Sequence, residues 1–142
     1  MRSERLQRII ELKEQLMEEK KRVLEQHNKK LQMVTNNIAY LTGEIDTNYK
    51  HLCTKCLNGH EFTVIRNYIE HLDRLKSTAV AHKEQIEKKI AAIRSELVEM
   101  LREIKTLTSL KEKLLSTAKK TQNKRHQKLL DEIALRTEGR EV

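Results

Sequence analysis

The chain has 142 residues, of which 35% are charged and 3% aromatic, and it contains three glycines, no proline and no tryptophan. A compact core of this size normally depends on aromatic side chains for much of its buried area, so the composition argues against an ordinary globular domain. The scarcity of glycine and proline argues equally against a β-sandwich, an α/β sheet or a bundle of many helices. The composition is therefore compatible with long helices, and intrinsic disorder is the competing class.

Large aliphatic residues in the first half recur at coiled-coil spacing, which argues against disorder. Every seventh residue from Ile10 to Leu52 is apolar. The second row of this half is less regular, and we expect the seam to shift once, near His27. The members of this second row are Ile9, Leu16, Val23, Val34 and Leu41.

The second half carries a longer seven-residue register, from Ile65 to Leu114, whose partner row is interrupted by lysines. These lysines are Lys76, Lys83 and Lys111. Between the two halves, Asn58-Gly59 gives the strongest turn signal of the chain, so we place the single reversal there. A hairpin about this point pairs residues whose numbers add to roughly 116.

These patterns predict an all-α fold, a long antiparallel two-helix coiled-coil hairpin with an overhanging C-terminal helix. We expect a single hairpin over residues 1–142, with arm one at about 4–52, the turn at about 53–61 and arm two at about 62–136. The overhang, at about 116–142, has no partner in the hairpin. Two interpretations of the overhang are open: it is a disordered tail, or it is a docking helix that becomes ordered on binding.

Charge and aromatic side chains lie at opposite ends of the expected hairpin. Of the net charge of +8, residues 1–30 carry +3 and residues 101–142 carry +5, while the middle is balanced. All four aromatic residues lie between positions 40 and 68. The hairpin therefore has a basic end and an aromatic tip, which suggests a different partner at each. Tyr40 and Tyr49 fall outside the seam, so we expect partly exposed rings near the turn.

A Cys-x-x-Cys step flanked by histidines places four candidate metal ligands inside ten residues at the turn. They are His51, Cys53, Cys56 and His60. Such a cluster has the spacing of half a tetrahedral zinc site, but the chain has no further cysteine to complete it. A redox pair and ordinary loop residues are the alternatives, and we assign no metal and no other cofactor.

Motifs for catalysis are absent from the sequence: it has no phosphate-binding loop, no His-Glu-x-x-His and no nucleophile elbow. We therefore expect a protein that is not an enzyme. The sequence also has no apolar run long enough to span a bilayer and no signal-type N-terminus, so we expect a cytoplasmic protein.

The C-terminal run from Asn123 to Arg136 resembles the closing motif of the flagellar export protein FliJ and its relatives in virulence type III secretion. That motif is Gln-Lys-x-x-Asp-Glu-x-Ala-x-Arg, and this chain matches it at Gln127, Lys128, Asp131, Glu132, Ala134 and Arg136. The stretch after the turn is also similar to the family, through Asn67-Tyr68, Leu75 and His82. The cysteine and histidine cluster departs from the family pattern.

The resemblance implies a central stalk whose terminal end enters a hexameric export ATPase and whose turn region contacts the membrane-embedded export gate. It further implies binding to export chaperones, and a cytoplasmic location at the inner-membrane export apparatus with only peripheral membrane association. The implied ATPase-binding residues are Lys119, Lys120, Lys124, Arg125, Gln127, Lys128, Leu129, Asp131, Glu132, Ile133 and Arg136. The implied gate-binding residues are Leu41, Tyr49, Tyr68, Leu75 and His82.

Two rival functions remain open from the residues alone. A homodimeric coiled-coil adaptor or tether has the same seam pattern. A nucleic-acid-binding coiled coil is suggested by the sequence pI of about 9.5, but acidic residues interleave with the basic ones, unlike the continuous basic block of a zipper protein, and we expect no nucleic-acid partner.

Overall fold

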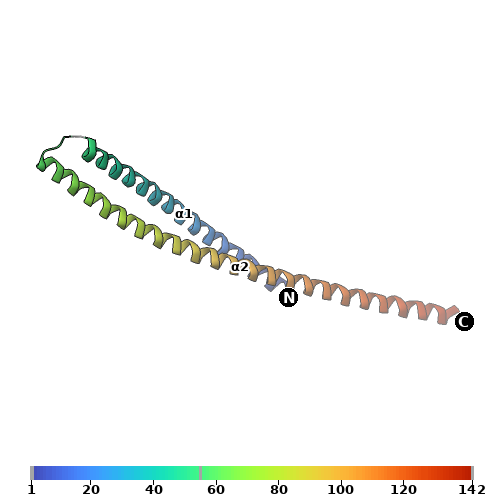
Figure 1. The fold of residues 1–142 in the computed structure, drawn as a ribbon. Helices are drawn as coiled ribbons and strands as arrows, with labels where there is room; N and C mark the ends of the chain where they lie inside the picture. Colours follow the sequence, from blue (N-terminus) through green and yellow to red (C-terminus); the bar gives the residue numbers. More distant parts are fainter. Residues whose placement is uncertain (1, 55, 142) are drawn as a thin grey trace. The chain divides into compact units, whose positions relative to one another are not determined.

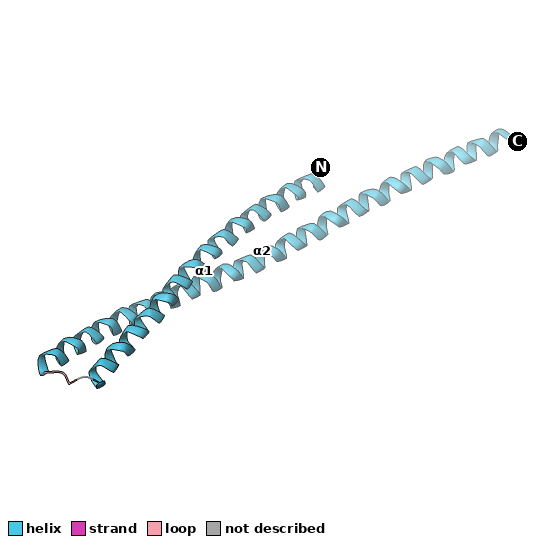
Figure 2. Ribbon diagram, turned by 90° about the horizontal axis from the view of Figure 1, so that it is seen from above, coloured by secondary structure: helices cyan, strands magenta, loops and turns pink. Residues whose placement is uncertain are grey.

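The structure is a computed structural model that describes residues 2–54 and 56–141. These residues form two α-helices, α1 (Arg2–Thr54) and α2 (Gly59–Glu141), which pack against each other (Figure 1). Figure 2 shows only helix and a short linker over this part of the chain, with no strand. The all-α helical hairpin predicted from the sequence is confirmed. The ends of the predicted range, residues 1 and 142, and position 55 of the predicted turn lie outside the described residues.

The linker ends in a helix cap formed by Asn58. The Glu61 backbone N–H donates to the Asn58 side-chain Oδ1 at 2.8 Å, and the Phe62 N–H donates to the Asn58 carbonyl at 3.0 Å. A side-chain oxygen at this position satisfies one of the N–H groups that have no partner inside a helix, and an acidic residue three positions later is common at such starts. The Asn-Gly pair therefore opens α2, and the non-helical residues 56–58 precede it directly.

The chain divides into two compact units, and each is described by itself. The turn unit consists of residues Glu19–Leu97 and contains the linker. The terminal unit combines α1 up to Glu18 with α2 from Val98 onward. Over the described residues, neither helix holds a stretch that is both apolar enough and long enough to span a membrane.

The core of the turn unit is a ladder of aliphatic side chains from the two helices. Leu41 and Ile45 of α1 cluster with Ile69 and Leu72 of α2, and Leu52, Ile65 and Ala79 pack around them. Further along α2, Ile86, Ile90 and Ile93 are also buried. Each fully buried aliphatic side chain contributes about 1.5–3 kcal/mol relative to an exposed one, so this ladder is the main source of stability.

The second buried row of α1 runs without a shift, so the expected step near His27 is wrong. In the turn unit this row comprises Lys20, His27, Val34, Leu41 and Asn48, all buried or half-buried. In the terminal unit, Leu6 and Lys13 hold the same spacing, while Ile9 and Leu16 are exposed. A lysine fits such a position because its aliphatic stem packs in the seam while its ammonium reaches the rim.

Ion pairs show the register of the two helices in each unit. In the turn unit the Lys20 ammonium pairs with Glu96, and in the terminal unit Lys13 pairs with Glu103. The residue numbers of both pairs add to 116, the value predicted from the turn. In the terminal unit Lys111 also donates a hydrogen bond to the Gln7 side chain, so a lysine that interrupts the apolar row of α2 has a partner on α1.

Candidate partner-binding surfaces

The C-terminal segment, defined here as residues 116–139, is helical and fully exposed. Helix α2 continues through it to Glu141, and every residue from 116 to 139 is exposed. Leu114 is the last half-buried residue of the terminal unit on α2. The structure therefore agrees with a helix in this segment, without α1 beside it, rather than with an unstructured tail.

The C-terminal segment carries exposed apolar residues outside the seven-residue row that forms the seam. Counting by sevens from Leu114 leads to Thr121, Lys128 and Leu135, so the seam row becomes mostly polar. The exposed apolar residues instead include Leu129 and Ile133, which are four residues apart and lie on one side of the helix, at 58% and 52% exposure. Leu129 and Ile133 therefore form an exposed apolar pair that α1 does not cover.

Basic residues dominate the rest of this segment, with six Lys and Arg against three Asp and Glu between positions 116 and 139. All eleven residues predicted from the family resemblance to bind the ATPase lie on this segment, and all are exposed. Gln127 donates a hydrogen bond to the Asp131 carboxylate one turn later, at 3.4 Å. The segment can present apolar and cationic groups to a partner at once.

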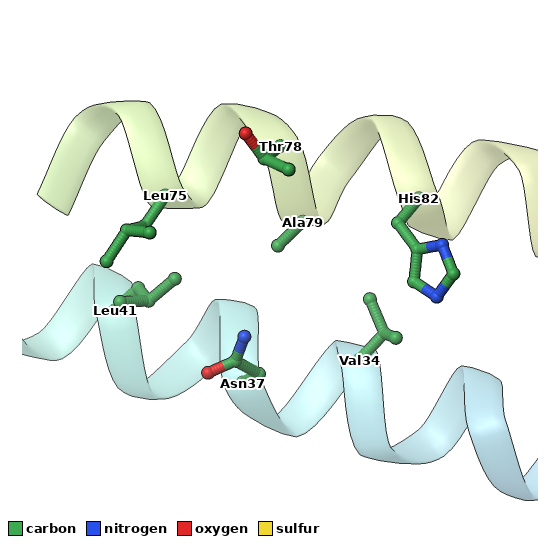
Figure 3. Close-up of a pocket in the computed structure, with 7 residues that line it drawn as sticks. All are labelled: Val34, Asn37, Leu41, Leu75, Thr78, Ala79 and His82. Carbon is green, nitrogen blue, oxygen red and sulfur yellow. The ribbon is translucent and has the colours of Figure 1, made fainter.

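A shallow groove of ≈ 310 Å³ follows the seam of the turn unit (Figure 3). In Figure 3 the side chains of Leu75, Ala79 and His82 on α2 point toward α1. Opposite them lie Leu41, Asn37 and Val34 in the same order. The groove is thus lined by Val34, Asn37, Leu41, Leu75, Thr78, Ala79 and His82.

The groove brings together three of the five predicted gate-binding residues. Leu41 is buried at its floor, while Leu75 and His82 are exposed at its rim. Tyr68 does not line the groove, but it lies seven residues before Leu75 and so belongs to the same stripe of α2. Tyr49 is half exposed on α1 and also lies outside the groove.

Sequence reasoning did not assign the other four groove residues to this site: Val34, Asn37, Thr78 and Ala79. Asn37 and Ala79 become neighbours of the predicted residues only through the pairing of the helices. The signal that could have found them is the register itself, because 37 and 79 also add to 116.

The cysteine and histidine cluster is not assembled into a metal site. Cys53 and Cys56 are free and exposed, and Cys56 and His60 line a shallow hollow of ≈ 620 Å³ together with Leu57, Glu61, Val64 and Ile65. Within residues 2–54 and 56–141, no three or more His, Cys, Asp and Glu side chains are grouped so that they could hold a metal ion. The structure therefore does not bring His51, Cys53, Cys56 and His60 together.

The fold defines a two-helix coiled-coil protein with exposed apolar and basic surfaces. Residues 1–141 match the family described as Flagellar FliJ protein, so this chain belongs to that family. Proteins of this family are components of the flagellar export apparatus and are not known as enzymes. No curated protein and no solved structure matched the chain.

Proposed function

We propose that this chain is the central stalk of the flagellar export apparatus. Its C-terminal segment inserts into the pore of the hexameric export ATPase, and the groove side of its turn unit contacts the export gate. One observation carries the proposal above all, the exposed helix of residues 116–139 with the exposed apolar side chains of Leu129 and Ile133. At 1.5 Å per residue this helix is about 36 Å long, which gives it the reach to enter a ring.

Helical propensity alone stabilises an isolated segment only marginally, so a partner that covers the apolar face would stabilise it further. Leu129 and Ile133 would then anchor the segment. Each contributes about 1.5–3 kcal/mol when fully buried, and the actual gain depends on how much of each side chain the partner covers.

The basic residues of the segment, such as Lys124, Arg125 and Lys128, face acidic loops in the ATPase pore according to this proposal. Charges at the rim of an interface mainly raise the association rate and fix the orientation, while buried apolar anchors slow dissociation. Stimulation of ATP hydrolysis then follows from occupancy of the pore, and the chain acts as a regulator without a catalytic residue of its own.

At the turn unit, the stripe Tyr68, Leu75 and His82 offers an aromatic, an aliphatic and an imidazole side chain on one side of α2. Exposed aromatic residues beside an apolar hollow are frequent anchors of protein interfaces. We assign this stripe, with Leu41 at the floor of the groove and Tyr49 nearby, to the export gate. Export chaperones are further partners in this proposal, and the chain works in the cytoplasm at the inner-membrane apparatus.

A test of the ATPase contact compares Ile133→Glu with Val98→Glu, because Val98 is similarly exposed, at 49%, but lies on α2 outside the C-terminal segment. Ile133→Glu should weaken binding to the export ATPase roughly tenfold to hundredfold, the equivalent of one buried aliphatic side chain. Val98→Glu should bind like the unchanged chain. Equal affinities of the two variants would argue against docking through this face.

The gate contact is tested with Leu75→Glu against Val80→Glu, since both positions are exposed on α2 within the turn unit but only Leu75 lines the groove. Co-purification with the gate protein should be lost for Leu75→Glu and kept for Val80→Glu. Both variants should still stimulate the ATPase. Loss of gate binding in both would mean that the groove is not the contact.

A further inference from the structure

Two thiols lie three residues apart in the sequence at the linker, and no proposed partner accounts for them. Cys53 and Cys56 are the two cysteines of the chain, and both are free and exposed. Cys53 lies in the last turn of α1, which ends at Thr54. Cys56 lies in the non-helical linker. Small reagents can therefore reach both sulfur atoms.

The spacing of the two cysteines suits an intramolecular disulfide. Disulfides need Cα atoms about 4.4–6.8 Å apart. Cys53 and Cys56 are three residues apart in the sequence, and a chain that reverses over such a separation brings the two Cα atoms to less than about 7 Å. Cys56 is not part of either helix, so its backbone can adjust without breaking a helical hydrogen bond.

The hydrogen bonds that open α2 are also compatible with closure. In both of them Asn58, two residues after Cys56, accepts from a backbone N–H group, of Glu61 in one and of Phe62 in the other. Movement at Cys56 therefore leaves the cap of α2 intact. The imidazole of His60 lines the same hollow as Cys56, and an imidazole is a base that can accept a proton as a thiolate forms.

We propose that Cys53 and Cys56 are a dithiol–disulfide pair that exchanges with low-molecular-weight disulfides such as glutathione disulfide. One protein thiolate attacks a sulfur of glutathione disulfide, forms a mixed disulfide and releases one glutathione thiolate. The second protein thiolate attacks the protein sulfur of that mixed disulfide and releases the second glutathione. Two protein thiols are oxidised, one glutathione disulfide is reduced to two glutathione thiols, and the two thiol protons pass to the departing thiolates.

The cross-link ties the last turn of α1 to the linker that leads into α2. Oxidation therefore fixes the conformation of the turn and leaves the two helices as they are. Reduction frees the linker again. The conformational freedom of the turn therefore depends on the redox state of the two cysteines. This inference does not depend on the stalk function.

The test equilibrates the full-length chain with glutathione disulfide and about 0.1 mM glutathione, quenches it in acid and measures the intact mass. Because groups joined by a short linker have effective concentrations in the millimolar range, the intramolecular disulfide should exceed the mixed disulfide about tenfold or more. The expected main species has lost two hydrogen atoms. Cys53→Ser and Cys56→Ser cannot close the bridge, so each should keep one bound glutathione.

A native chain that carries mainly bound glutathione, or that forms mainly disulfide-linked dimers, would overturn the proposal. Circular dichroism of the oxidised and reduced chains provides a second measurement. Equal helical signals are expected, because the bridge lies at the end of α1 and in the linker. A loss of helical signal on oxidation would contradict this placement of the bridge.

Discussion

The Lys20 ammonium donates a hydrogen bond to the Glu96 carboxylate across the turn unit, although Lys20 occupies a half-buried position of the seam. Lys20 interrupts an apolar row of α1, and its partner Glu96 lies on α2, so the pair depends on the register of the two helices. Sliding α2 by one heptad in the direction that brings Lys89 opposite Lys20 would turn the attraction into a repulsion. The charges therefore disfavour this shift, which the apolar ladder alone would tolerate.

Charge reversal tests this register. Lys20→Glu places two carboxylates against each other and should lower the free energy of unfolding by up to about 1 kcal/mol, because the pair is partly exposed. The double variant Lys20→Glu with Glu96→Lys should recover most of the loss. Urea denaturation followed by circular dichroism measures both. Lys29→Glu, an exposed position on α1, changes the net charge equally and should have little effect. Equal losses in Lys20→Glu and Lys29→Glu would show that the pair does not contribute.

His27 is a second polar residue of the same row, and its Nδ1 atom is buried without a hydrogen-bond partner among the described residues. Leaving a buried polar group unpaired costs about 1–3 kcal/mol. His27→Leu removes this group and adds apolar area, so it should raise the free energy of unfolding by about 1 kcal/mol or more. The exposed His71 supplies the control, since His71→Leu should change little. A destabilised His27→Leu variant would mean that the imidazole has a partner that the structure does not show.

The first apolar row could be predicted from the sequence because all of its members are aliphatic or methionine. The second row could not, since Lys13, Lys20 and His27 look like surface residues, and the exposed Ile9, Leu16 and Val23 look like core. The long stem of lysine makes residue type a weak guide to burial in a two-helix seam. Spacing was the better guide: counting back by sevens from Val34 reaches all three polar residues.

The exposed C-terminal segment was also predictable, because the first arm is too short to cover it. The groove was predictable only in part. Leu75 and His82 came from the resemblance to the family, whereas Asn37 and Ala79 enter the groove through the pairing of the helices. The sequence pattern of one helix does not show which residues of the other helix lie opposite it. That information comes from the position of the turn, which sets the register.

Gly43 lies in the interior of α1, and a Cβ atom built there meets nothing within 4 Å. Glycine in a helix interior costs roughly 0.5–1 kcal/mol relative to alanine. Gly43→Ala should therefore raise the free energy of unfolding by about that amount in urea titrations. Gly139 offers a matched control, because its site is equally open but lies in the last turn of α2, where alanine should gain little. No gain at Gly43 would contradict the helical geometry described for this position.

Removing residues 119–142 should leave the paired part of the chain unaffected. The deletion takes 23 of the 136 helical residues of α1 and α2 (53 and 83 residues), so the helical signal should fall by about a sixth. Because the removed side chains up to 139 are all exposed, the midpoint of thermal unfolding should not change. A clear fall in the midpoint would show that the C-terminal segment packs on the rest of the chain.

The central claim is that the C-terminal segment engages the export ATPase. It is tested most directly by the rate of ATP hydrolysis of the hexameric export ATPase at increasing concentrations of this chain, with and without residues 119–142. We expect the full chain to raise the rate and the shortened chain to leave it at the basal value while retaining a folded hairpin by circular dichroism. Equal stimulation by both chains would contradict the claim.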